Sequence, residues 1–381
     1  MTILCEFGPG GQAAVFGRAE AVITAEGAED LPGALEALEA ARARGRWIAG
    51  YVTYEAGYAL EPRLAPLMPL GRQGPLLAMG VFAGPEPADE LLARAEAEAG
   101  SARMTEPQPM VTRQDYDRAV RRVLDYLAAG DCYQVNLTFP LRAEPAGGTA
   151  LGLYGQLRRT GPVAHGALVD LGVGPVVLSR SPELFFRVEA DGRILSRPMK
   201  GTAPRDPDPA RDAAIAAALA ASLKDRAENL MIVDLLRNDI SRIAEVGSVK
   251  VPQLFHMERY STVHQMTSTI EGRLTGRPGF GELMRALFPC GSITGAPKIR
   301  AMEIIRELEP HPRGVYCGAI GWMAPDGRAD FSVAIRTLSL IPGGGIVLNV
   351  GGGVVMDSTP EGEWEEALWK ARFVKAAVRR D

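Results

Sequence analysis

Two hydrophobic periodicities run through the chain and predict helices and strands in an irregular order. Apolar residues three or four positions apart predict helices at residues 34–44, 88–103, 113–129, 209–237, 281–287, 296–308 and 360–378. Apolar or alternating runs predict strands at residues 47–58, 134–141, 166–171, 175–188, 193–197, 315–323, 329–340 and 345–350. Because the two kinds of element are mixed without regular alternation, the pattern favours a layered α+β fold over a repeating βαβ sheet.

A short loop divides the chain into two unequal parts. Residues 103–109 carry two prolines and few apolar side chains, so we place a subdomain boundary there without expecting the parts to fold separately. Residues 1–108 form the predicted N-terminal subdomain, and residues 109–381 form the larger domain with the motifs described below. Thr112 and Thr359 are expected to be helix N-caps in this domain.

The composition argues against several classes of protein. The 381 residues carry a formal net charge of −4, which offers no basic surface for nucleic acid. No apolar run is long enough to cross a membrane, and the N-terminus lacks a signal-peptide pattern. Four scattered cysteines indicate buried thiols in a reducing compartment. We therefore expect a cytoplasmic protein whose partners are small molecules or another protein.

A glutamate and a lysine flank a predicted β-hairpin. Asp191-Gly192 is a two-residue turn signal, and an ideal hairpin centred there would place Glu183 opposite Lys200. Pro198 can introduce a bulge, so the neighbourhood of the two side chains is a firmer prediction than their register. The pair is either a surface salt bridge or a partly desolvated lysine with a lowered pKa, which can act as a base or nucleophile.

Two carboxylates lie one turn apart on an apolar helix. Residues 225–239 are apolar nearly all round, so we expect this helix to be buried and Asp225 and Glu228 to need partners. These partners are either Arg226 and Arg237, in internal salt bridges, or a hard metal ion, which prefers carboxylate oxygens.

A glycine run precedes an acidic helix near the end of the chain. Gly351, Gly352 and Gly353 follow a predicted strand, and backbone N–H groups of such a run can approach an anion closely. One face of the next helix is lined by Glu363, Glu366 and Lys370. That face is either simply solvated or part of a site, and the glycine run favours a site.

The remaining candidates are small hydroxyl residues and isolated polar side chains. Residues 289–298 place glycines and Ser292 ahead of a helix whose N-terminus either is simply capped or receives a carboxylate. Arg336 lies in an apolar strand-like segment and needs an anionic partner. Tyr316 also lies in strand-like sequence, and His264 is one of four histidines.

In this order the motifs resemble those of the chorismate-utilising enzyme family, which includes anthranilate, isochorismate, salicylate and aminodeoxychorismate synthases. The resemblance covers roughly residues 112–378. It rests on Asp131-Cys132-Tyr133-Gln134, Ser181-Pro182-Glu183, Lys200-Gly201-Thr202, Ala227-Glu228-Asn229, Gly295-Ala296-Pro297-Lys298 and the final block of glycines and glutamates. It implies a single large chorismate-binding fold, in which two antiparallel sheets pack as a sandwich with helices around it.

Two positions indicate which reaction the resemblance implies. Family members that add water carry a lysine where this chain has Gln134, which argues against isochorismate and salicylate synthesis. Lysine at the position of Lys200 marks the aminodeoxychorismate synthases, whereas anthranilate synthases carry alanine there. The implied product is 4-amino-4-deoxychorismate, on the route to p-aminobenzoate and folate, with anthranilate synthesis as the nearest alternative. A non-catalytic relative is disfavoured because the catalytic and metal-binding positions are intact.

The resemblance also implies roles for individual residues. Lys200 is the nucleophile that attacks C2 of the ring, with Glu183 as general acid and base. Mg²⁺ is held by four carboxylates, directly by Glu228 and Glu366 and through water by Asp225 and Glu363. Chorismate is contacted by Gly351, Gly352, Gly353, Lys370, Arg336, Tyr316, Ser292, His264 and Thr202. A separate glutamine amidotransferase subunit supplies the ammonia.

Overall fold

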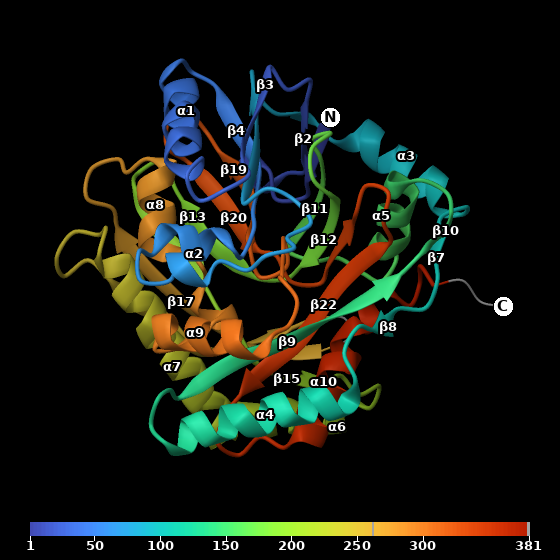
Figure 1. The fold of residues 1–381 in the computed structure, drawn as a ribbon, viewed down its shortest axis with the longest axis vertical. Coiled ribbons are helices and arrows are strands. Elements are labelled where there is room, and N and C mark those ends of the chain that lie inside the picture. Colours follow the sequence, from blue (N-terminus) through green and yellow to red (C-terminus); the bar gives the residue numbers. More distant parts are fainter. Residues whose placement is uncertain (261–262, 379–381) are drawn as a thin grey trace.

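Two large antiparallel sheets form the centre of the molecule (Figure 1). The computed structural model describes residues 1–260 and 263–378. The first sheet has the order β18 (Gly295–Ala296), β9 (Gln134–Ala143), β22 (Ile346–Val354), β21 (Thr337–Leu340), β12 (Val176–Ser181), β11 (His165–Asp170), β1 (Thr2–Cys5), β2 (Ala14–Gly17) and β6 (Glu86–Pro87), with β8 (Gln108–Pro109) also paired to β9. The second has the order β15 (Met199–Pro204), β17 (Val263–Arg273), β14 (Arg193–Arg197), β13 (Leu184–Val188), β20 (Ala329–Val333), β19 (Ala319–Met323), β4 (Trp47–Val52), β5 (Leu77–Phe82) and β3 (Ala21–Ala25), with β16 (Lys250–Arg259) also paired to β17.

The two sheets share a buried layer made of alternate residues along their strands. Ile3 and Cys5 of β1 belong to one buried cluster with Tyr51 of β4 and Trp322 of β19. Leu4, between the first two, belongs to a different cluster, because successive strand residues point to opposite faces. The predicted α+β sandwich is therefore confirmed.

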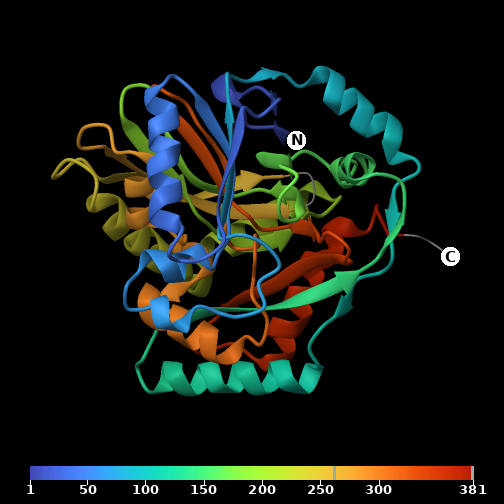
Figure 2. The ribbon, with the colours of Figure 1, turned by 45° about the horizontal axis from the view of Figure 1, so that its top comes forward.

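Helices cover the outer faces of the sheets. Their bounds are α1 (Leu31–Ala43), α2 (Ala56–Leu60), α3 (Asp89–Ala99), α4 (Arg113–Ala128), α5 (Ala150–Arg158), α6 (Pro209–Ala221), α7 (Leu223–Ser241), α8 (Phe280–Leu287), α9 (Lys298–Leu308) and α10 (Pro360–Lys370). A short strand pair, β7 (Arg103–Met104) with β10 (Pro145–Gly147), lies apart from the sheets. Figure 2 shows α4 crossing the bottom of the molecule, and it packs there on α10, β9 and β22.

The predicted N-caps are confirmed. The Thr112 hydroxyl accepts a hydrogen bond from the backbone N–H of Asp115 at 3.1 Å, and the Thr359 hydroxyl accepts one from Gly362 at 3.1 Å. Each hydroxyl satisfies an N–H that has no partner within the first turn of its helix. These caps fix where α4 and α10 begin.

The helix predicted at residues 209–237 is wrong in two respects. It is divided at Ser222, which ends α6 and caps α7. The burial predicted for residues 225–239 also does not hold throughout, since Leu230 is 42% exposed. One face of α7 packs on β15, β17 and α8, and the opposite face remains open. Its apolar composition therefore does not make it a buried helix.

Two strands predicted as continuous are each split between the sheets. The chain leaves β12 in the first sheet and enters β13 in the second through residues 182–183. It returns from β20 to β21 through residues 334–336. Neither crossing is long enough to be recognised as a loop: the first is Pro182-Glu183 and the second is Ala334-Ile335-Arg336. The hydrophobic pattern therefore could not reveal the change of sheet.

The N-terminal 108 residues are interleaved with the rest of the chain. β1 pairs with β11, and β4 pairs with β19, so this segment supplies strands to both sheets. The predicted boundary at residue 108 stays a prediction. All four cysteines are buried and free, as expected. Within residues 1–260 and 263–378, no helix combines the length and the hydropathy needed to cross a membrane.

Candidate active site

A cavity of about 500 Å³ lies between the two sheets, α7 and α10. It brings together thirteen of the predicted residues: Glu183, Lys200, Thr202, Asp225, Glu228, Ser292, Tyr316, Arg336, Gly351, Gly353, Glu363, Glu366 and Lys370. These residues come from segments as far apart in sequence as 183 and 370. The cavity is therefore the candidate active site.

The predicted hairpin forms, but its register differs from the prediction. Gly192 has a positive φ of 82° and closes a three-residue loop, in which Glu189 rather than Ala190 faces Arg193. A further bulge follows between Leu184 and Arg187. The direct opposition of Glu183 and Lys200 is therefore wrong. The predicted neighbourhood is confirmed, because both side chains line the cavity.

Lys200 reaches the cavity from β15, at the edge of the second sheet. Burial is the main cause that lowers the pKa of its ammonium group, while the nearby Glu228 and Glu183 carboxylates oppose this shift. Its Nζ atom lies against Gly353 of the first sheet: a Cβ atom at Gly353 would come within 2.8 Å of it. Lys200 thus spans the gap between the sheets and forms no salt bridge with any residue that the structure describes.

We predict that Gly353→Ala will impair the site without unfolding the protein. The added methyl group would also lie 2.9 Å from Gln134 Nε2, so Lys200 must move away from its observed position. Because a shift of about 1 Å in a reacting group can cost about 100-fold in rate, we expect kcat to fall at least tenfold. Steady-state kinetics, with a thermal melt to verify folding, tests this. Gly100→Ala at the end of α3, where φ is −56° and a Cβ meets no atom within 4 Å, is the matched control for glycine replacement.

Glu183 lies on the first crossing between the sheets and is 4% exposed. Its backbone carbonyl accepts a hydrogen bond from the N–H of Val333 at 3.1 Å, which ties it to the second crossing. Burial raises the pKa of its carboxyl group to about 7, although the Ser292 hydroxyl and the Lys200 ammonium act in the opposite direction. Its Oε1 atom is buried without a hydrogen-bond partner in the described residues. Glu183 is therefore suited to exchange a proton near neutral pH.

Two helices bring four carboxylates to one wall of the cavity. Asp225 and Glu228 come from α7, and Glu363 and Glu366 come from α10. Burial raises the pKa values of Glu228 and Glu363. Burial also acts to raise the pKa of Glu366, but its 2.7 Å ion pair with Lys370 outweighs this and leaves the pKa lowered. The four carboxylates of this wall outnumber the lysines that line the same cavity, which are Lys200, Lys224 and Lys370.

The structure does not contain the internal salt bridges that were the alternative partners of Asp225 and Glu228. Arg237 pairs with Asp234 at 2.8 Å, and the Arg226 guanidinium lies 4.8 Å from the ring centre of Phe255. Neither arginine is therefore committed to Asp225 or Glu228.

The carboxylate wall fits a magnesium ion by its chemistry. In the described residues, no group of three or more His, Cys, Asp or Glu side chains is arranged to hold a metal. Mg²⁺ does not need such a group, since it binds through one or two carboxylates and keeps several water molecules. Glu363 Oε2 is buried and has no hydrogen-bond partner in the described structure, while its Oε1 accepts a 2.6 Å bond from Ser358. A buried carboxylate oxygen without a partner is typical of a ligand to a cation.

The glycine run lies between the carboxylates and Lys200. The Lys370 ammonium donates a 2.8 Å hydrogen bond to the Gly351 carbonyl. Gly352 does not line the cavity, which differs from the prediction. It instead faces α10, where a Cβ would lie 2.9 Å from Glu363 Oε2. The absence of a side chain at Gly352 therefore lets α10 approach β22 closely.

Arg336 and Tyr316 lie in turns rather than in strands, contrary to the prediction. Arg336, on the second crossing, has a positive φ of 50°, and its carbonyl accepts a 3.0 Å hydrogen bond from Arg180 N–H. Burial lowers the pKa of its guanidinium group. Arg336 makes no ion pair with any described residue, so its charge remains available to an anion in the cavity. Tyr316 precedes β19 and is 7% exposed.

His264 does not reach the cavity, and its predicted contact with the substrate is not supported. It is fully buried, and its Nε2 lies 2.7 Å from Asp212 Oδ1. The next residue, Gln265, lines the cavity instead, because neighbouring strand residues point to opposite faces. The Gln265 side chain accepts a 2.8 Å hydrogen bond from Thr202 Oγ1 and donates one of 2.9 Å to the Gly201 carbonyl.

The N-terminus of α9 lies outside the cavity lining. Pro297 caps the helix without a side-chain hydrogen bond, and Lys298 donates to Asp239 at 2.7 Å and to the Leu287 carbonyl at 3.0 Å. Lys298 thus joins α9 to α7 and α8. Ser292, in a short 3₁₀ turn (Gly291–Ile293), does line the cavity as predicted.

Several cavity residues were not among the predicted site residues: Asn136, Lys224, Gln265, Asn349, Trp369 and Phe373. Asn136 lies two positions after Gln134 on β9, and Lys224 precedes Asp225, so proximity to the motifs was the available signal. Gln134 is fully buried, and both polar atoms of its side chain have no partner in the described residues. The Gln134 side chain lies beside Gly353: a Cβ atom at Gly353 would lie 2.9 Å from Gln134 Nε2 and 2.8 Å from Lys200 Nζ.

The chain matches the family model for chorismate binding enzymes over residues 3–376. It belongs to the chorismate-binding enzyme family. It is 48% identical over 267 residues to aminodeoxychorismate synthase component 1 of Escherichia coli, a match that covers 70% of this chain and 58% of that protein. It is 44% identical over 275 residues to anthranilate synthase component 1 of Streptomyces coelicolor, covering 71% of this chain and 52% of the relative. The matches thus span little more than half of the relatives' length.

Solved structures of the family share the fold. Anthranilate synthase component I from Streptococcus pneumoniae superposes with a TM-score of 0.79 at 24% identity, covering 98% of this chain and 91% of the other. The menaquinone-specific isochorismate synthase of Escherichia coli gives 0.75 at 19% identity, with 99% and 88% covered. At these identities the likeness establishes the fold and leaves the reaction open.

Proposed function

We propose that this chain converts chorismate and ammonia to 4-amino-4-deoxychorismate. The observation that carries the proposal is the position of Lys200, half-buried in the cavity with a lowered pKa and directed at the glycine strand. Relatives named aminodeoxychorismate synthase component 1 at 47–48% identity support the same assignment. Anthranilate synthesis is the second candidate, because a relative of that name is 44% identical.

Lys200 and Glu183 carry the proposed chemistry. The neutral Lys200 amine forms a bond to ring C2 while the bond from C4 to its hydroxyl breaks, and the protonated Glu183 carboxyl gives its proton to the departing oxygen as water. Ammonia then bonds to C4, the bond from C2 to Lys200 breaks, and the Glu183 carboxylate takes up the surplus proton. The enolpyruvyl group is retained throughout, so the product keeps both carboxylates.

Opposite charges hold the substrate in the proposed complex. Arg336 and Tyr316 bind the enolpyruvyl carboxylate, while Lys370 and the backbone of Gly351 and Gly353 face the ring carboxylate. The carboxylates Glu228 and Glu366, with Asp225 and Glu363 supporting them, would hold Mg²⁺, which supplies a positive charge beside the ring carboxylate. A glutamine amidotransferase subunit is the proposed source of ammonia in the cell. We propose that this chain acts in the cytoplasm.

The test is a mass-resolved product assay with the purified chain, chorismate, Mg²⁺ and ammonium at mildly alkaline pH. An amino-substituted product that retains its enolpyruvyl group and that a lyase converts to p-aminobenzoate is the expected result. Chelation of Mg²⁺ should stop its formation, and re-addition should restore it. Anthranilate with pyruvate would instead favour the second candidate, and a hydroxylated isomer would refute both aminations.

A further inference from the structure

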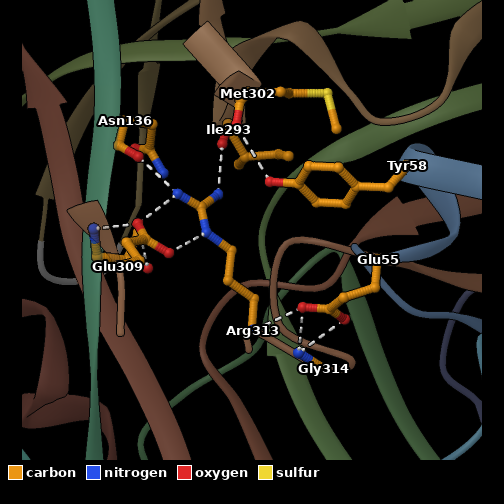
Figure 3. Close-up of polar contacts among 9 residues, drawn as sticks. Glu55, Tyr58, Asn136, Ile293, Met302, Glu309, Arg313 and Gly314 are labelled. Atoms are coloured by element: carbon orange, nitrogen blue, oxygen red, sulfur yellow. Dashed lines mark hydrogen bonds and ion pairs between the residues drawn. The ribbon is translucent and has the colours of Figure 1, made fainter. Parts of the chain in front are cut away.

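A buried arginine outside the cavity connects several of its walls (Figure 3). Arg313, in the loop between α9 and β19, has a side chain that is 1% exposed. Its guanidinium forms a two-point ion pair with Glu309, at 2.8 and 2.7 Å. It also donates to the Ile293 carbonyl at 2.8 Å and to the Asn136 carbonyl at 2.6 Å. Both carbonyls belong to residues that line the cavity.

Glu309 extends this network to the glycine strand. Its Oε1 accepts hydrogen bonds from the Thr138 backbone N–H at 2.8 Å and from the Thr138 hydroxyl at 3.0 Å. Thr138 is the register partner of Gly351 in the pairing of β9 with β22. The ion pair is therefore attached to β9 at two points, and through β9 it is attached to the strand that faces Lys200 and Lys370.

The backbone of the arginine is fixed as firmly as its side chain. Glu55, at the start of α2, accepts hydrogen bonds from the N–H groups of Arg313 at 2.7 Å and of Gly314 at 3.1 Å. Tyr316 follows three residues later and lines the cavity. Hydrogen bonds thus fix both the backbone and the side chain of Arg313, which leaves its loop little freedom to shift.

We infer that Arg313, with Glu309, is a positioning residue for the chorismate site. It acts through the carbonyls of Asn136 and Ile293 and through Thr138, and it touches no reacting atom. This inference rests on the proposed function, because it concerns the placement of walls that bind chorismate.

The geometry requires arginine at this position. A planar guanidinium offers five N–H donors in a fixed fork, and here it serves a carboxylate and two carbonyls that point from different elements. Lysine keeps the positive charge but cannot satisfy that arrangement, so at least one carbonyl or one carboxylate oxygen loses its partner. The β9 wall and the 3₁₀ turn that carries Ser292 would then be free to separate.

The test compares Arg313→Lys with a matched control, Arg187→Lys. Two nitrogens of Arg187, whose side chain is 41% exposed, each lie 2.6 Å from one oxygen, Oδ2, of the buried Asp330, and Arg187 does not line the cavity. We expect Arg313→Lys to raise the KM for chorismate about tenfold or more, and to weaken equilibrium binding of chorismate similarly. Arg187→Lys should lower the melting temperature but leave both constants within about twofold of the parent.

The outcomes separate this inference from the proposed function. If the parent protein does not aminate chorismate, the proposed function fails, and the binding measurement still decides the role of Arg313. If Arg313→Lys melts at a lower temperature but binds chorismate as the parent does, Arg313 only stabilises the fold and the inference is overturned. If Arg313→Lys does not fold, Glu309→Gln decides in the same way, because it keeps the side-chain shape and removes the charge of the pair.

Discussion

Replacement of Lys200 by alanine is expected to reduce the amination of chorismate about 1000-fold or more, because the variant has no nucleophile to form the bond to C2. The lysine is suited to this role because burial lowers its pKa, so that more of it is in the neutral, nucleophilic form than of an exposed lysine. Initial rates of amino-product formation, at saturating ammonium and Mg²⁺, measure the loss. Mass spectrometry of the parent protein under turnover should also find an adduct on the peptide that carries Lys200.

The control for this experiment is Lys224→Ala. Lys224 lines the same cavity and carries the same charge, but it is exposed at the start of α7. We expect its removal to cost less than about tenfold, since a solvent-screened charge contributes little. Equal losses in the two variants would mean that Lys200 contributes only its charge, and undiminished turnover by Lys200→Ala would remove its covalent role.

Replacement of Glu183 by glutamine is expected to lower kcat/KM for chorismate by about 100- to 10,000-fold, the usual contribution of a general acid or base. Glutamine has nearly the same shape and can still accept a hydrogen bond from the Ser292 hydroxyl, but it cannot give a proton to the departing C4 hydroxyl. A normal rate in the glutamine variant would exclude Glu183 from proton transfer.

The pH dependence of the parent enzyme should report the same carboxyl group. The pKa of Glu183 is about 7, and its protonated form is the one needed when the hydroxyl leaves. As the pH rises through 7 that form is lost, which opposes the gain in neutral Lys200, so kcat/KM for chorismate should rise less steeply with pH above 7 than below it. The measurement needs a constant concentration of free ammonia, which otherwise rises with pH. The change of slope near pH 7 should be absent from whatever activity Glu183→Gln retains.

The fold class and the helix caps could be predicted from the sequence because they depend on local chemistry. Thr112 and Thr359 cap their helices by interactions within one turn. The crossings at residues 182–183 and 334–336 could not be found in this way, since spans of two and three residues leave no loop-length break between the strands. The strands β15, β16 and β17 were also missed. β16 is largely exposed, and the pairing of all three is set by tertiary contacts rather than by local pattern.

The candidate site was predictable as a set of residues but not as a geometry. Lys200 and Glu183 were expected to be neighbours, but a three-residue turn at Gly192 and a bulge moved their register. His264 was placed in the site by the family resemblance, and only the direction of its side chain on β17 excludes it. Arg313 bears no local signal of importance, because its role depends on carbonyls of residues 136 and 293 that folding brings to it.

The two crossings have a mechanical consequence. Glu183 and Arg336 lie on adjacent segments that pass between the sheets, and these segments are joined by the hydrogen bonds of Val333 to Glu183 and of Arg180 to Arg336. Any shear of one sheet along the other must be absorbed by these short spans, so the proton-transfer group and the free guanidinium would be displaced first. A displacement of one sheet relative to the other would therefore move Glu183 and Arg336 together.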